Sequence, residues 1–160
     1  MEKLYFESTA GRLYYNQAGY VRLAWLPGRL TLADIQTYYE QVLALLISTG
    51  SHRILSEHGQ RSPLPADAQQ WLTTNWIPRA QTMAGTHHCA IVEGANPMHR
   101  LSTQSVVSAA PAGFVFKRFD TIREAEGWLA GWRGLITELY RRRASPAHAK
   151  KPGQSAGLFS

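Results

Sequence analysis

The sequence predicts an α/β protein in which amphipathic helices cover a mixed β-sheet. Short segments rich in β-branched and aromatic residues alternate with longer segments whose apolar residues recur at three- and four-residue steps. The first two short segments are separated only by a glycine-containing turn, which indicates an N-terminal β-hairpin. The predicted order is therefore β-β-α-β-α-β-α-β-α, with the later strands parallel through right-handed crossovers.

The composition fits one folded domain followed by a basic tail. The chain has 160 residues, of which 44% are hydrophobic, and both values are typical of a single globular domain. Five of the 17 basic residues follow Tyr140, namely Arg141, Arg142, Arg143, Lys150 and Lys151. Removing them leaves 12 basic residues against 11 acids, so the net charge of +6 lies mostly in the tail. We expect a single domain over residues 1–140 and a basic, disordered tail over 141–160.

These counts argue against several classes of protein. A DNA-binding domain would carry its basic stripe on the folded surface, so we expect no nucleic-acid partner. The single cysteine excludes an internal disulfide framework. No apolar run approaches the roughly 18 residues that cross a bilayer, and the N-terminus lacks the apolar core of a signal peptide. The default expectation is a cytoplasmic protein.

The predicted hairpin comprises strands 12–16 and 20–26. A helix follows, because Thr31 and Asp34 have the spacing of a capping box and Gly50 can end the helix as a left-handed cap. Its buried face is predicted to hold Ile35, Tyr38, Tyr39, Val42, Leu45 and Leu46.

The central part of the chain contains a strand and a proline-rich helical region. Residues 52–56 form the predicted strand. After a loop, Ser62-Pro63-Leu64-Pro65 can start a helix, since proline is tolerated in a first turn. The helix continues over 66–75, and Pro78 either kinks it or begins a second short helix.

The last third repeats the alternation of strand and helix. Residues 88–92 form the clearest buried strand, and Asn96-Pro97 begins the next helix as N-cap and first position. The inward residues of that helix are predicted to be Met98, Leu101, Val106 and Val107. Residues 113–119 alternate as a half-exposed strand, and Thr121 and Glu124 have capping-box spacing at the start of the last helix.

Several of these segments carry a family resemblance. They are Trp25-Leu26-Pro27-Gly28, Arg53-Ile54-Leu55-Ser56, Trp71-Leu72 with Trp76-Ile77-Pro78-Arg79-Ala80, Ala90-Ile91-Val92, and Phe119-Asp120 with Glu124-Ala125 and Trp128-Leu129. In this succession, over roughly residues 10–130, the chain resembles the bacterial SpoIIAA-like proteins, small relatives of STAS domains that are also labelled STAS/SEC14-like. The resemblance implies a STAS-like mixed sheet and a regulatory or ligand-binding module without a defined reaction.

The resemblance also directs attention to one loop. In the anti-sigma-factor antagonists of the STAS group, a phosphorylatable serine follows an aspartate in the loop after the third strand. This chain has Ser56-Glu57-His58-Gly59-Gln60-Arg61-Ser62 there, without the Asp-Ser-Ser-Gly pattern. Ser62 is the loose counterpart and the candidate for phosphorylation. The SEC14 part of the label implies lipid or other apolar ligands.

Polar side chains gather at one predicted edge of the sheet. Ligands of open α/β sheets bind beyond the carboxyl ends of the parallel strands. These polar side chains follow two neighbouring strands and would lie at such ends. The candidate partner- or ligand-binding residues are Ser56, Glu57, His58, Arg61, Ser62, Glu93, Asn96 and His99. The alternative is that Ser62 caps a helix and the others are solvated.

Trp71 and Trp76 are further candidates for binding. They are five residues apart and cannot both face squarely inward on one straight helix. One of them would then be exposed to a partner or an apolar ligand. The alternative is core packing around the Pro78 kink.

The patterns that would indicate catalysis or a metal site are weak. Cys89 follows His87 and His88, but side chains alternate across a strand, so a buried, inert Cys89 is favoured. The histidines lack metal-ligand spacing, and neither phosphate-binding glycine loops nor a GxSxG motif occurs. We assign no catalytic residue, no metal and no cofactor.

The leading hypothesis is a non-enzymatic, STAS-like regulatory module that binds a protein partner through residues 56–62, with a place in a signalling pathway. The second is a carrier of a small apolar or lipid-like ligand. An enzyme comes third, and a cleft in which His58, His99 and an acid converge would favour it. The identity of the partner or ligand and the oligomeric state stay open.

Overall fold

A six-stranded sheet forms the centre of the protein in a computed structural model that describes residues 1–143, with only the backbone described at 132–140 and 143. The strands lie in the sheet in chain order. They are β1 (Glu2–Glu7), β2 (Gly11–Asn16), β3 (Tyr20–Trp25), β4 (Arg53–Glu57), β5 (His88–Val92) and β6 (Val115–Phe119). The first three strands pair antiparallel, and β3 to β6 pair parallel. The predicted α/β class with a mixed sheet is confirmed.

The predicted order of elements lacks one strand. β1 pairs with β2 ahead of the predicted hairpin, so three strands precede the first helix. Five of its six residues are exposed, because β1 lies at the edge of the sheet. An edge strand buries too little surface to show the apolar alternation by which strands are recognised.

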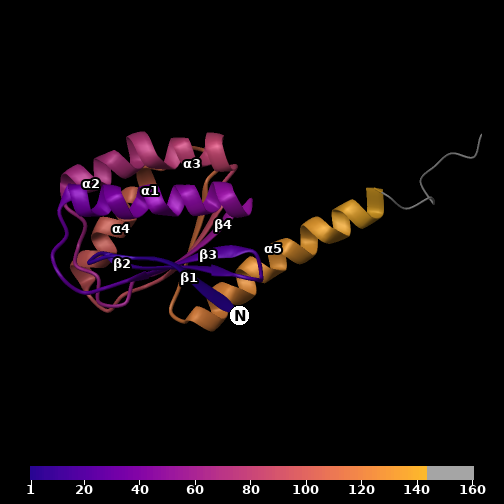
Figure 1. Ribbon diagram of the computed structural model, residues 1–160, viewed down its shortest axis with the longest axis horizontal. Coiled ribbons are helices and arrows are strands. Elements are labelled where there is room, and N and C mark those ends of the chain that lie inside the picture. Colours follow the sequence, from indigo (N-terminus) through magenta and orange to yellow (C-terminus); the bar gives the residue numbers. More distant parts are fainter. Residues whose placement is uncertain (144–160) are drawn as a thin grey trace, which may run out of the picture. The chain divides into compact units, whose positions relative to one another are not determined.

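Helices cover both faces of the sheet. They are α1 (Leu32–Thr49), α2 (Ala66–Trp71), the π-helical turn η1 (Leu72–Trp76), α3 (Ile77–Ala84), α4 (Pro97–Ala109) and α5 (Ile122–Arg143). Figure 1 shows α1, α2 and α3 together on one side of the sheet. The larger core lies on this side and includes side chains of α1 to α4. A smaller core on the other face packs Ala125 and Leu129 of α5 against Leu55 and Ala90.

The predicted helix starts rest on side-chain caps that are present in the structure. Thr31 Oγ1 accepts from the Asp34 N–H at 3.2 Å, and Asp34 Oδ2 accepts from the Thr31 N–H at 2.9 Å, which completes the capping box. Gly50 ends α1 in the left-handed region, at φ 68°. Asn96 Oδ1 accepts from the Met98 N–H at 2.9 Å at the start of α4. These ends of helices were therefore determined by local sequence.

The proline-rich region differs from its prediction in two ways. The helix begins at Ala66, with Pro65 at the N-cap and no side-chain cap, so Ser62 does not start it. Pro78 lies near the start of α3, directly after η1, in which the Ile77 N–H bonds to the Leu72 carbonyl across five residues. Since proline lacks an N–H and crowds the preceding turn, the wider π turn accommodates it.

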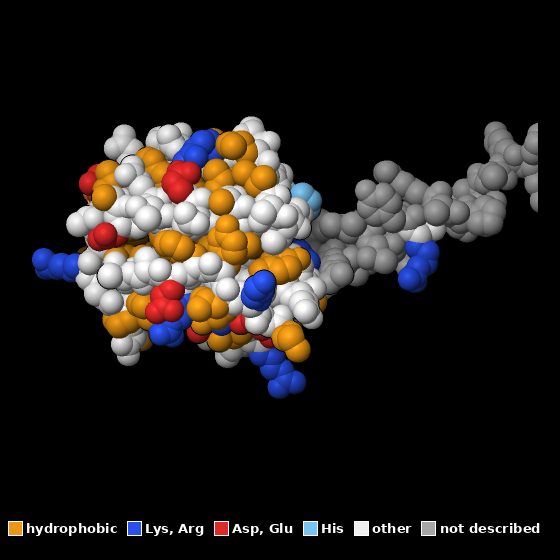
Figure 2. All heavy atoms as spheres, in the orientation of Figure 1, with side chains coloured by type: hydrophobic (Ala, Val, Ile, Leu, Met, Phe, Trp, Pro, Cys, Tyr) orange, Lys and Arg blue, Asp and Glu red, His pale blue; other side chains and the backbone are white. Residues whose placement is uncertain are grey.

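The chain divides into two units, residues 1–129 and 130–160. α5 is helical through Arg143, so the three arginines assigned to the tail are helical, and the rest of that predicted tail, 144–160, lies outside the described residues. On the face shown in Figure 2, Lys and Arg side chains are dispersed among acidic, apolar and uncharged ones. Within residues 1–143, no helix combines the length and apolar content that crossing a membrane requires.

Candidate ligand-binding cavity

A cavity of about 50 Å³ lies between the sheet and the helices of the larger core. Its walls are mainly apolar. The sheet contributes Leu23, Ile54, Cys89, Ile91 and Phe116, and the helices contribute Leu72, Trp76, Ile77, Val106 and Val107. Such a volume is about a third of that of a cavity that holds a benzene molecule, so it has room for only a few heavy atoms. Concave, mostly apolar sites with a few converging polar groups are typical of small-molecule binding.

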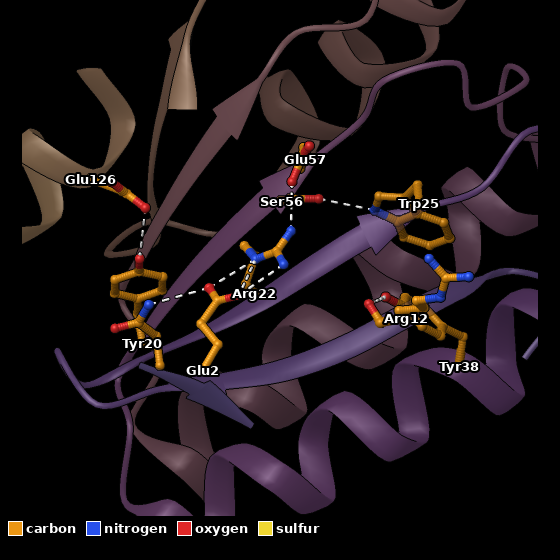
Figure 3. A network of polar contacts seen from close by, with 10 residues as sticks. Glu2, Arg12, Tyr20, Arg22, Trp25, Tyr38, Ser56, Glu57 and Glu126 are labelled. Atoms are coloured by element: carbon orange, nitrogen blue, oxygen red, sulfur yellow. Dashed lines mark hydrogen bonds and ion pairs between the residues drawn. The ribbon is translucent and has the colours of Figure 1, made fainter. Parts of the chain in front are cut away.

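Polar side chains form one end of this cavity. They are Tyr39, Ser56, His58, Arg61 and Thr103. Ser56 faces the cavity because it alternates along β4 with Leu55, which packs in the smaller core on the other face. At the end of β3, the Trp25 indole donates from Nε1 to Ser56 Oγ at 3.0 Å (Figure 3).

A tight turn after β4 carries Arg61 back into the interior. The His58 N–H bonds to the Val92 carbonyl at 3.0 Å, and the Arg61 N–H bonds to the His58 carbonyl at 2.9 Å. Gly59 has φ 54°, which favours glycine. A Cβ on Gly94 would lie 2.5 Å from the Gly59 carbonyl oxygen, so the turn and the end of β5 approach closely. The side chains of Ser56, His58 and Arg61 are all at most 4% exposed as a result.

Two histidines continue the polar chain from Ser56. His58 Nε2 lies 3.1 Å from Ser56 Oγ, and His58 Nδ1 lies 2.7 Å from His99 Nε2. An indole N–H can only donate, so Ser56 Oγ accepts from Trp25 and has its own hydrogen for His58 Nε2. His58 then donates from Nδ1 to His99. This assignment satisfies each of these contacts with both imidazoles neutral.

Burial and charge keep these imidazoles neutral. Desolvation lowers the pKa of His58 well below its usual value, and the nearby Arg61 and His99 add to the effect. Desolvation and then Arg61 lower the pKa of His99 to about 4, partly offset by the backbone of Ser62. Both imidazoles therefore act at neutral pH as uncharged hydrogen-bonding groups.

Arg61 is the charged member of the cluster, and its charge is not balanced by any residue that lines the cavity. Its side chain is 3% exposed, and its Cζ lies 4.3 Å from the centroid of the Trp25 ring. Its Nε and Nη1 have no hydrogen-bond partner among the residues that the structure describes. Burial lowers the pKa of Arg61, while the neighbouring Tyr39 raises it, and a guanidinium remains charged in proteins. A buried ion without a counter-ion costs several kcal/mol, and a cation–π contact recovers about 2 kcal/mol of this.

The structure separates the other predicted site residues from this cluster. Glu57 points to the opposite face of the sheet, where it accepts from Arg22 at 2.7 Å (Figure 3). Glu93 pairs with Arg118 at 2.8 Å. Asn96 is exposed and caps α4. The side chain of Ser62 is half-buried, and only its backbone lies beside His99. The predicted candidates thus form an internal group, Ser56, His58, Arg61 and His99, and a group outside it.

The π turn changes the interpretation of the two tryptophans. Both rings contact Tyr39, with centroids 6.4 Å away for Trp71 and 4.7 Å away for Trp76. Trp76 is buried, lines the cavity and donates from Nε1 to the Tyr39 carbonyl at 2.8 Å. The prediction that only one could face inward assumed a straight α-helix, whereas a five-residue step is nearly one turn of η1.

The predicted inward face of α4 was right for Val106, which is buried, and Val107, which is half-buried, but wrong for the other two residues. Met98 and Leu101 are 62% and 63% exposed. The buried side chains are His99, Ser102, Thr103 and Val106. These residues have the same i, i+3, i+4, i+7 spacing as an apolar stripe, and this spacing could have identified Ser102 and Thr103, which the sequence analysis missed. A hydrophobic pattern does not reveal this stripe, because three of its four side chains are polar. Trp25 and Tyr39 were also missed as site residues, because only the fold brings them to Arg61.

The remaining candidate chemistry is limited. Cys89 is buried, and burial raises the pKa of its thiol to about 12, so it is a thiol at neutral pH. Within residues 1–143, no group of three or more His, Cys, Asp or Glu side chains is placed to hold a metal ion. His58 and His99 converge, but with Arg61 rather than an acid beside them.

Comparison with known proteins adds no assignment: no family model and no curated protein matches this chain.

Proposed function

We propose that this protein binds a small molecule with an apolar body inside the cavity between the sheet and α1 to α4. The observation that carries the proposal is an apolar cavity whose polar groups converge at one end. Apolar walls gain free energy when they bury an apolar body, and a few fixed polar groups orient it. The SEC14 part of the family resemblance is compatible with such a ligand.

The burial of the polar residues favours a small ligand over a docked protein at this place. Ser56, His58 and Arg61 expose at most 4% of their surface. A protein surface cannot reach them without opening the fold, whereas a small molecule needs only a transient opening between helices.

Native mass spectrometry of the purified protein and tryptophan fluorescence test the proposal. Trp76 lines the cavity, so occupation by butanol, butyramide or butyrate should change its emission. Val106→Phe should abolish the response, because the larger side chain fills the cavity. Val115→Phe is the matched control at an exposed strand position and should leave the response unchanged. A protein without a retained ligand that responds to none of the probes would exclude the proposal.

A STAS-like protein-interaction module is the second candidate. The exposed Met98 and Leu101 favour it, because they lie three residues apart on one surface of α4, next to the candidate residue Asn96. A partner that is captured by the wild type and lost from Leu101→Glu, but kept by Gln104→Glu on the exposed surface, would support this function. Equal capture by both variants would contradict it.

A further inference from the structure

Arg61 carries a positive charge, and the residues that line the cavity supply no counter-ion. None of the residues that line the cavity is acidic. The acids of the neighbouring strand ends are engaged elsewhere, Glu57 with Arg22 and Glu93 with Arg118. The Trp25 ring lies against the guanidinium, and Tyr39 is hydrogen-bonded to it, which leaves Nε and Nη1 without an acceptor among the described residues.

The unused donors point to an anion as their partner. Nε and Nη1 of Arg61 are buried and have no acceptor among the described residues. Hydrogen bonds between guanidinium and carboxylate are charge-assisted and stronger than bonds between neutral groups. The relay of Ser56, His58 and His99 next to it consists of neutral groups, so one negative charge is enough to neutralise this end of the cavity.

The rest of the cavity limits the kind of anion. Its walls are apolar and its volume is about 50 Å³, so the hydrocarbon body must be short, and the side chains of the wall must move apart to admit three carbons. A phosphate has at least three oxygens that need hydrogen-bond donors. The lining offers one arginine, and the hydrogens of Ser56 Oγ and His58 Nδ1 already serve His58 and His99. A carboxylate carries the single negative charge that balances Arg61, and it can accept from Nη1 at the outer end of the guanidinium.

We propose that the ligand is the anion of a small monocarboxylic acid, with its carboxylate on the Arg61 guanidinium and its hydrocarbon body between Ile54, Trp76 and Val106. This assignment rests on the proposed function and specifies the ligand of the same cavity. In the empty protein, the position of Arg61 is costly, and the ligand supplies the missing counter-ion.

Three probes of similar size, added to the wild-type protein, test the proposal by calorimetry and tryptophan fluorescence. Butyrate, butyramide and butanol share an apolar body, and only butyrate has a charged head group. Butyrate should bind at least about tenfold more tightly than the other two, because only it neutralises Arg61. Inorganic phosphate should bind more weakly than butyrate, because it has no apolar body.

Arg61→Met should remove the preference for butyrate, and Arg61→Lys should retain part of it through charge alone. Arg12→Met, at an exposed arginine on β2, is the matched control and should bind butyrate like the wild type. Arg61→Met should also melt no lower than the empty wild type, since a buried unpaired charge is replaced by an apolar chain. An unchanged melting temperature shows that Arg61→Met does not lose its preference for butyrate through unfolding.

The outcomes separate the two proposals. Equal binding of all three probes, blocked by Val106→Phe, would overturn the carboxylate assignment and leave the proposed function intact. Phosphate binding as tight as butyrate would overturn it as well, in favour of a plain anion site. No binding of any probe, with no retained ligand, would overturn both proposals.

Discussion

Arg61 determines the protonation state of its neighbours as well as the charge of the cavity. Its guanidinium repels a second positive charge, and burial already disfavours charged imidazoles at His58 and His99. The two histidines are thereby held as neutral partners in one hydrogen-bonded chain with Ser56. The histidines therefore couple folding to pH.

Acidification should destabilise the protein through these histidines. The folded-state pKa values of His58 and His99 lie below the unfolded value of about 6.5. Below that pH the unfolded chain binds more protons, so the stability present above it is lost as the pH falls. Each excess proton lowers the free energy of unfolding by about 1.4 kcal/mol per pH unit.

Urea denaturation between about pH 7 and pH 5 measures this dependence. His99→Gln should make the loss of stability with falling pH less steep, because one of the two groups no longer titrates. Thr37→Ala, at an exposed position that does not titrate, should retain the wild-type slope. Identical slopes for the wild type and His99→Gln would contradict the assignment of His99 as a proton-linked group.

At the scale of elements, two kinds of helix ends coexist in this fold. α1 has a complete capping box and a glycine cap, both formed by residues close in sequence. The run from α2 through η1 to α3 has no side-chain cap at Pro65 and widens into a π turn before Pro78. Its geometry follows from packing, since Trp71 and Trp76 both contact Tyr39 of α1.

Thr31→Ala should destabilise α1 and hence the protein by about 1 kcal/mol, because the Asp34 N–H loses its side-chain acceptor. Thr37→Ala removes the same groups from an exposed position inside α1 and should have no cost. Chemical denaturation of both variants provides the comparison. Butyrate affinity should be unchanged in both variants, since Thr31 lies outside the cavity. Equal stabilities of Thr31→Ala and Thr37→Ala would show that the cap is not required.

At the scale of the whole molecule, an ion-pair network connects strands that are distant in sequence. Arg22 of β3 donates from Nε to Glu2 of β1 at 2.9 Å and from Nη1 to Glu57 of β4 at 2.7 Å (Figure 3). These side chains are only partly exposed, so solvent screens the network less than a surface pair. The network therefore holds the N-terminal edge strand against the parallel part of the sheet.

Arg22→Met should lower the free energy of unfolding by about 1–2 kcal/mol, since it leaves Glu2 and Glu57 as neighbouring like charges. High salt should reduce this difference. Arg12→Met breaks the exposed pair with Glu7, which is 3.5 Å long, and should cost less than about 0.5 kcal/mol. Urea titrations at two salt concentrations measure both variants. Equal costs at Arg22 and Arg12 would show that the network does not contribute.

The sequence predicted those elements whose signal is local. The hairpin, the capped start of α1, the buried strand β5 and the Asn96 cap of α4 depend on residues a few positions apart, and each is present. β1 escaped prediction because it lies at the edge of the sheet, where five of its six residues are exposed and show no apolar alternation. Of the cluster at the cavity, the sequence singled out Ser56, His58, Arg61 and His99 as candidates, because residues at the ends of neighbouring parallel strands come close together.

What the sequence by itself determined is the class of the fold and the presence of polar residues after its parallel strands, since hydrophobic periodicity and capping are properties of short segments. Only the tertiary structure decided that Arg61 is buried without a counter-ion, that α4 turns His99 and Thr103 inward, and that Trp25 and Tyr39 lie beside them. Burial and the pairing of charges depend on which segments pack together. A local pattern cannot determine this packing, because the contacts that decide it join residues far apart in the chain.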